Sequence, residues 1–61
     1  MSCARAVELH LEATSHEGTA HLEIVLVDDH GDRFVTDIVG PEADVRAEAA
    51  FLAEQYHLAV A

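Results

Sequence analysis

Residues 19–31 read Thr-Ala-His-Leu-Glu-Ile-Val-Leu-Val-Asp-Asp-His-Gly, and this segment carries the clearest structural signal in the chain. Its apolar residues recur at every second position: Ala20, Leu22, Ile24 and Leu26. A period of two is typical of a half-buried β-strand, so the sequence predicts a strand over residues 19–28. The end of the stretch, Asp29-His30-Gly31, indicates a three-residue hairpin loop in which Gly31 takes the left-handed conformation. A further antiparallel strand should therefore follow.

The segments on both sides continue this pattern. Residues 6–14 alternate apolar and polar in the same way, and a turn at residues 15–18 separates them from the second strand. Residues 33–39 form the third predicted strand. The first hairpin, closed on Thr14 and Thr19, predicts these pairs: Val7 with Leu26, Leu9 with Ile24, Leu11 with Leu22, His10 with Glu23 and Glu12 with His21. The second hairpin, closed on Asp28 and Asp32, predicts the pairs Leu26 with Phe34, Leu22 with Ile38, Val25 with Val35 and Glu23 with Asp37.

A helix is expected after the third strand. Residues 40–44 open it, with Pro41 in the first helical position and two acidic residues near the positive end of the helix dipole. The helix should run to about His57, and one stripe of it should cover the Leu/Ile/Phe face of the sheet: Val45, Ala49, Leu52 and Tyr56. The sequence thus predicts a single α+β domain over residues 1–61. It consists of a three-stranded antiparallel meander (β-β-β) with one C-terminal helix packed on one face.

The charge of the chain limits its partners. Twelve Asp and Glu stand against three Arg, with no Lys, so the net charge is -9. Direct binding to nucleic acid or to an anionic membrane is disfavoured, because both need clustered basic residues. Cys3 is alone and can form neither an intrachain disulfide nor a thiolate cluster. We find no signal peptide and no run long enough to span a membrane, and therefore expect a cytoplasmic protein.

Two surfaces are left over once the helix covers its face of the sheet. The first is acidic, and we expect it to bind a basic protein partner through Glu8, Glu12, Glu23 and Asp37 on the sheet and Asp28, Asp29 and Asp32 at the hairpin tip. The second is apolar and carries Val25, Val27, Val35 and Val39, although an open sheet face usually carries polar residues there. Phe51, on the side of the helix turned away from the sheet, adds to it, and together these five residues predict a homo-oligomer interface. Two alternatives stay open: Phe51 at the edge of the core, and an acidic charge that serves solubility alone.

The order of elements is similar to that of the small partial ribonuclease-H-like domains of HicB-type antitoxins, and more loosely to that of double-stranded-RNA-binding domains. The similarity is in the order β-β-β-α alone and assigns no functional residue. It fits the function that the charge favours, a small acidic protein-protein interaction module that acts as an inhibitor or antitoxin on a basic, nucleic-acid-binding surface.

The histidines suggest a second function. His10 and His21 are weak candidates for metal ligands, because side chains on facing strands point in parallel and rarely converge on one ion. Charge pairs with Glu23 and Glu12, which would raise both histidine pKa values, are the simpler interpretation. We expect no cofactor and no metal, and nothing in the sequence indicates an enzyme. The alternative function is a homo-oligomeric domain that binds a ligand or metal between subunits through its histidines.

Overall fold

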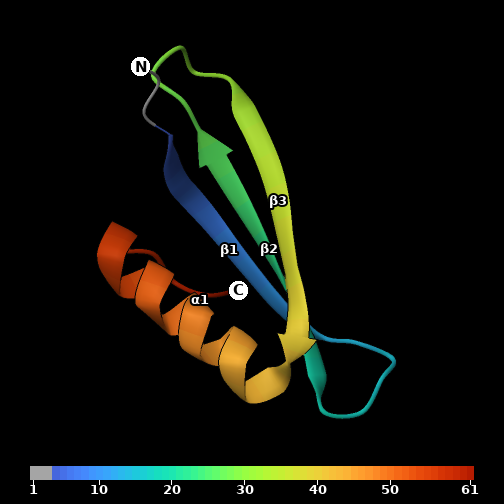
Figure 1. Ribbon diagram of the computed structural model, residues 1–61. Coiled ribbons are helices and arrows are strands. Elements are labelled where there is room, and N and C mark those ends of the chain that lie inside the picture. The colour runs from blue at the N-terminus through green and yellow to red at the C-terminus, as the bar shows by residue number, and fades with distance from the viewer. Residues whose placement is uncertain (1–3) are drawn as a thin grey trace.

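The computed structural model describes residues 4–61, so Cys3 lies outside the described residues. The described chain forms β1 (Arg5–Ala13), β2 (Thr19–Val27), β3 (Arg33–Pro41) and α1 (Glu42–Tyr56). The strands make an antiparallel sheet in the order β1-β2-β3, and α1 lies across one of its faces (Figure 1). The predicted α+β meander with a C-terminal helix is confirmed. In the described part of the chain, no helix is long and apolar enough to cross a membrane.

The register of the sheet is the predicted one, with one exception. All the pairs predicted between β2 and β3 are present, and Leu9, His10, Leu11 and Glu12 of β1 face their predicted partners. The predicted pair of Val7 with Leu26 is wrong, because the register shifts between Ala6 and Glu8 and Ala6 stands opposite Leu26. A β-bulge of this kind adds one residue to one strand, which reverses the faces of the residues before it. Ala6 is accordingly buried in the core, while Val7 is half-buried.

The helix packs on the sheet through the predicted stripe. Val45 and Ala49 are buried, and Leu52 and Tyr56 pack against the same core. The start of the helix differs from the prediction, because Pro41 still belongs to β3 and has an extended backbone with φ of -55° and ψ of 133°. Glu42 then begins α1, and its N–H donates to the carbonyl of Gly18 at 2.8 Å. This bond ties the first turn of the helix to the loop between β1 and β2.

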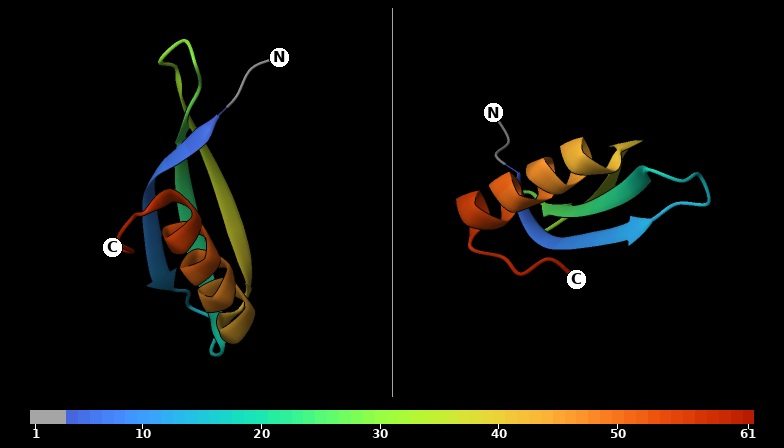
Figure 2. Two further views of the ribbon diagram at one scale, coloured as in Figure 1. Left: turned by 90° about the vertical axis from the view of Figure 1, so that its left-hand side faces the viewer. Right: turned by 90° about the horizontal axis from the view of Figure 1, so that it is seen from below.

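The helix is shorter than the sheet that it covers. A helix of 15 residues is about 22 Å long, whereas a strand of nine residues is about 30 Å long. The hairpin that joins β2 to β3 therefore extends beyond α1 (Figure 2). Phe34, which the sequence places on the covered face, is 50% exposed for this reason. Its predicted burial is wrong, although its pairing with Leu26 is right.

The two edges of the sheet are completed differently. On the outer side of β1, the end of the chain adds a short parallel bridge between Leu9 and Val60. Ala61 fixes it, because its N–H donates to Leu9 O and its carbonyl accepts from Leu11 N–H, both at 2.9 Å. Among residues 4–61, no segment pairs with the outer side of β3. One edge is thus partly closed by the chain itself and the other is open.

Candidate docking surface

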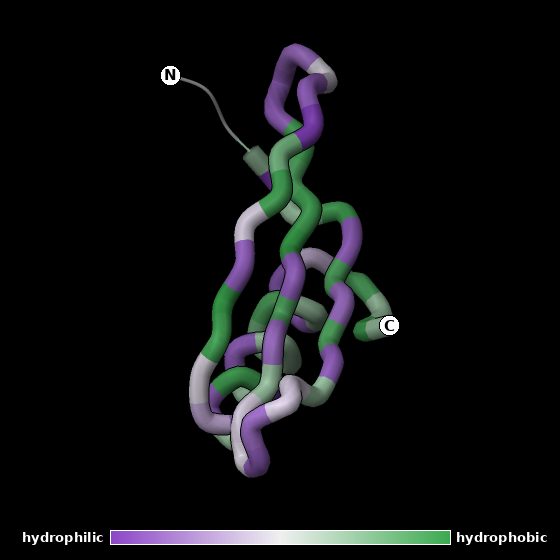
Figure 3. Tube along the Cα trace, turned by 90° about the vertical axis from the view of Figure 1, so that its right-hand side faces the viewer, coloured by the Kyte–Doolittle hydropathy of each residue, from purple (hydrophilic) through white to green (hydrophobic). Residues whose placement is uncertain are grey.

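The outer face of the sheet, which is the face turned away from α1, carries the predicted carboxylates. Figure 3 shows this face, with hydrophilic and hydrophobic residues alternating along the strands and the helix behind them. The register places four acidic side chains on it, from all three strands: Glu8, Glu12, Glu23 and Asp37. The structure therefore brings together the sheet residues that the sequence selects as partner contacts.

One polar cluster on this face joins all three strands through His21. Its Nδ1 lies 3.3 Å from Glu12 Oε1, and its Nε2 lies 3.0 Å from Asp37 Oδ1. The contact with Glu12 is the predicted cross-strand pair, and Asp37 is a second, diagonal partner. The hydrogen bond to Asp37, followed by that to Glu12, raises the pKa of His21 above its usual range. His21 thus lies between a carboxylate of β1 and a carboxylate of β3 and offsets the repulsion between them.

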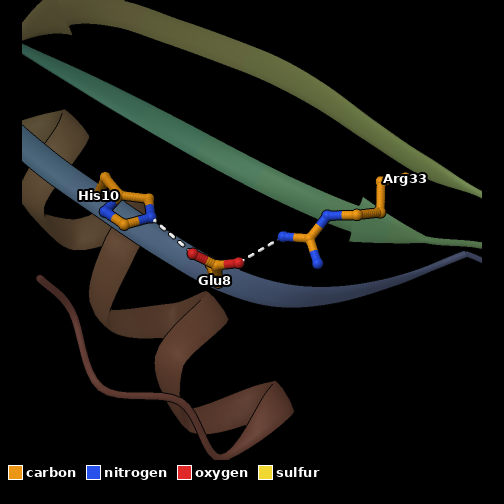
Figure 4. A network of polar contacts seen from close by, with 3 residues as sticks. All are labelled: Glu8, His10 and Arg33. Carbon is orange, nitrogen blue, oxygen red and sulfur yellow. Dashed lines mark hydrogen bonds and ion pairs between the residues drawn. The ribbon is translucent and has the colours of Figure 1, made fainter.

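A second cluster is centred on Glu8 (Figure 4). His10 Nε2 lies 3.1 Å from Glu8 Oε1, and Arg33 Nη2 donates to Glu8 Oε2 at 2.5 Å. The predicted ion pair of His10 with Glu23 is absent from residues 4–61, because His10 contacts its neighbour two positions back on the same strand. The hydrogen bond from His10, followed by that from Arg33, lowers the pKa of Glu8. Glu8 therefore stays ionised to a lower pH than an ordinary glutamate does.

The Arg33–Glu8 pair changes the predicted valine surface. Arg33 lies on β3 and Glu8 on β1, so their hydrogen bond passes over β2, between Val25 and Val27. Val25 is only 6% exposed, and the expectation that it lies open on the sheet face is wrong. Val27 is half-buried. A long arginine side chain can lie along apolar surface while its charged end bonds to a distant partner, and the path of Arg33 over β2 fits this behaviour.

Three large apolar side chains remain exposed among those predicted as interface residues. Val35 is 60% exposed, Val39 is 65% exposed and Phe51 is 60% exposed. Phe51 is not among the residues that pack against the core, so the alternative that placed it at the core edge is wrong. These side chains lie on two different surfaces, because Val35 and Val39 belong to β3 and Phe51 to the helix.

Two of the three acidic side chains predicted as partner contacts at the hairpin tip are exposed, and the third, Asp28, is buried. Asp28 is 9% exposed, and its Oδ1 accepts hydrogen bonds from the N–H groups of His30 and Asp32 at 2.8 and 2.9 Å. This carboxylate holds the loop closed and is not free to contact a partner. Asp at the first position of a turn is a known signal for this role, which the sequence reading missed. Asp29 and Asp32 are exposed, and Gly31 has the predicted left-handed backbone, with φ of 84°.

Residues 4–61 contain no group of three His, Cys, Asp or Glu side chains placed to hold a metal ion. A hollow of about 460 Å³ lies between β1, the start of α1 and the end of the chain, where Arg46 donates to Glu42 at 3.0 Å.

Comparison of the chain with protein-family models, curated proteins and solved structures finds no match in any of the three.

Proposed function

We propose that this protein is a small acidic interaction domain that docks the outer face of its sheet on a basic surface of another protein. The observation that carries the proposal is the set of four carboxylates on one face, drawn from three strands, against two arginines, Arg5 and Arg33, that the register places at one end of the same face. The favoured partner is a nucleic-acid-binding protein, on which the domain would act as an inhibitor or antitoxin.

The spacing of the carboxylates supports this choice. Neighbouring strands lie about 4.8 Å apart, and side chains on one face recur about every 6.7 Å along a strand. Negative charges at such intervals on a stiff sheet resemble the rows of phosphates along a nucleic acid backbone. Three of the four carboxylates are held in place by hydrogen bonds that they accept. Glu12 and Asp37 accept from His21, and Glu8 accepts from Arg33. A fixed acceptor loses little conformational entropy on binding.

The charge of the whole chain supports fast association with a basic target. A net charge of -9 on 61 residues creates a long-range negative field that attracts such a surface. Protonation of His21 adds a positive charge in the middle of the face. Docking should therefore weaken as the pH falls through the raised pKa of His21.

The test is affinity capture with a matched pair of variants. The first replaces the four carboxylates of the outer face, Glu8, Glu12 and Glu23 by Gln and Asp37 by Asn. The second makes the same four-charge change elsewhere, at exposed Glu17, Glu48 and Glu54 by Gln and Asp44 by Asn. Wild type and the second variant should capture basic proteins that a short DNA duplex elutes, and the outer-face variant should not. Binding of a purified captured protein should weaken steeply between about 50 and 500 mM NaCl.

Two outcomes would contradict the proposal. If both variants bound the captured protein equally weakly, total charge and not the outer face would control binding. If the outer-face variant bound as wild type does, with the same salt dependence, Asp29 and Asp32 at the hairpin tip would be the next candidates. Circular dichroism shows that each variant is folded before binding is measured.

The alternative function, ligand or metal binding between subunits through histidines, has no observation in its favour. His10 and His21 are each engaged with carboxylates of their own sheet. A cytoplasmic location belongs to the first proposal, because nucleic-acid-binding machinery is the partner class that it invokes.

A further inference from the structure

We propose that the open edge of β3 pairs with β3 of a second copy of this chain, which gives a two-fold symmetric dimer with one continuous six-stranded sheet. The two strands run antiparallel and are centred on Val35. This interaction uses an edge of the sheet, whereas the docking proposed above uses its outer face, and the two share Arg33 and Asp37.

The backbone of β3 carries an unused set of hydrogen-bonding groups. Asp28 N–H donates to Asp32 O at 3.0 Å. Hydrogen-bonded pairs recur at every second residue of an antiparallel ladder, so Phe34 and every second residue after it direct their backbone groups toward β2. The residues between them therefore direct their N–H and C=O groups outward: Arg33, Val35, Asp37 and Val39. Such a row is a template for another strand.

β3 has few of the features that usually protect an edge strand. Natural edges are often short, bulged, interrupted by proline or rich in charged side chains, lysine above all, and β3 has only the charges of Arg33 and Asp37. β3 has nine residues and an unbroken register, its only proline is its last residue, and the chain contains no lysine. Val35 and Val39 leave 60% and 65% of their surfaces exposed on this strand. An edge of this kind should not remain unpaired at high protein concentration.

The side chains of β3 are complementary to themselves in one register. With Val35 opposite its own copy, Arg33 faces Asp37 of the second copy, and the reverse pair forms by symmetry. A register centred on Asp37 sets two carboxylates against each other, and one centred on Thr36 sets Val35 against Asp37. Like charges placed opposite each other are destabilising, whereas apolar and opposite-charge pairs each stabilise a sheet. The register centred on Val35 also allows about six backbone hydrogen bonds between the copies.

The existing contacts of these charged side chains differ in how the dimer affects them. Arg33 reaches over β2 to Glu8, away from the open edge, so its guanidinium must turn from Glu8 to pair with Asp37 of the second copy. Asp37 uses Oδ1 for His21, and Oδ2 makes no hydrogen bond within residues 4–61. The pair between copies therefore replaces the exposed Arg33–Glu8 contact and leaves the His21 cluster in place.

Salt should strengthen this dimer. Each copy carries a charge of -9, so the long-range repulsion between two copies is large at low ionic strength. Salt screens that repulsion, while the backbone hydrogen bonds and the valine contact are affected little. Docking on a basic partner should respond in the opposite direction, so failure of one proposal is distinguishable from failure of the other.

The first experiment measures mass by sedimentation and light scattering at low and high salt. Wild type should approach twice the 6.6 kDa mass of the chain as protein and salt concentrations rise. Val35→Glu places two carboxylates opposite each other at the centre of the interface and should raise the dimer Kd about tenfold or more. Phe51→Glu is the matched control, because Phe51 has the same 60% exposure and the change adds the same charge away from the strand edge. It should dimerise like wild type after a small correction for charge.

The second experiment tests the register by charge exchange. Arg33→Asp and Asp37→Arg should each dimerise weakly alone, because like charges then face each other. Mixed together, they should form a heterodimer in which every charged pair is restored.

Three results would overturn the proposal. One is a single-chain mass at all concentrations and salt levels. Another is dissociation by Phe51→Glu but not by Val35→Glu, which would place the interface on the helix. The last is a mixture of the two charge variants that associates no better than either variant alone while both are folded.

Discussion

β1 and β3 are the two edge strands of one sheet, and they differ in regularity and in whether another segment pairs with their outer side. β1 has a bulge between Ala6 and Glu8, and the end of the chain covers part of its outer side through Leu9 and Val60. β3 is regular over nine residues, and no described segment covers it. Bulges and covering segments are the means by which proteins prevent unwanted strand pairing. The edge that lacks both is therefore the one suited to pairing with another chain.

The helix reinforces this difference. The core-facing residue Leu9 of β1 is 1% exposed, whereas Phe34, on the same face of β3, is 50% exposed. The cause is the length of α1, which leaves the hairpin between β2 and β3 uncovered (Figure 1). Stability should consequently be concentrated at the β1 side, and surface for interaction at the β3 side.

The largest expected effect on stability comes from shortening one of these two side chains, Leu9, and is compared with the effect of shortening the other, Phe34. Leu9→Ala should lower the free energy of unfolding by about 2–5 kcal/mol, because it creates a cavity in a closed core. Phe34→Ala should lower it by about 1 kcal/mol, because half of the ring is already in water. Urea denaturation at a protein concentration that keeps the chain monomeric measures both values. Equal losses for the two variants would mean that the β3 side is packed as tightly as the β1 side.

Much of the sheet follows from the sequence because its pattern is strictly local. The alternation of apolar residues places β2 at the centre and fixes every predicted pair with β3. The bulge in β1 could not be predicted, because Val7 continues the apolar alternation and no special residue is needed at such a site. The bridge between Leu9 and Val60 was missed for a related reason, since a single parallel bridge leaves no periodic pattern.

The composition of the candidate site was predicted, together with its contact between His21 and Glu12, but its other contacts were not. The four carboxylates share a face because face depends only on alternation and register. Their partners depend on the reach and direction of individual side chains. Arg33 extends over β2 to Glu8, and His10 contacts Glu8 in place of Glu23. Neither contact follows from strand pairing alone.

A smaller effect concerns His21, which connects the β1 side to the β3 side through Glu12 and Asp37. Its folded pKa lies above the unfolded value of about 6.5. The stabilisation from this cluster is therefore fully present below that value and is lost as the pH rises through the folded pKa. Asp37→Asn should lower the pKa of His21 more than Glu12→Gln does, because Asp37 makes the larger contribution.

NMR titration of His21 in both variants measures this order. Glu54→Gln, an exposed change on the helix, is the control and should leave the titration of His21 unchanged. A larger shift from Glu12→Gln than from Asp37→Asn would show that the cluster is held mainly by β1.

The contrast between an edge closed by its own chain and an edge open to a second copy is tested most directly by amide hydrogen exchange. Exchange is carried out at about 5 µM and about 500 µM protein and read out residue by residue. The amide of Leu11, which bonds to Ala61, should be protected equally at both concentrations. The outward-pointing amides of Val35 and Asp37 should exchange fast at the lower concentration and become protected at the higher one. Equal exchange of Val35 and Asp37 at both concentrations would contradict the account, as would protection of Leu11 that appears only at the higher concentration.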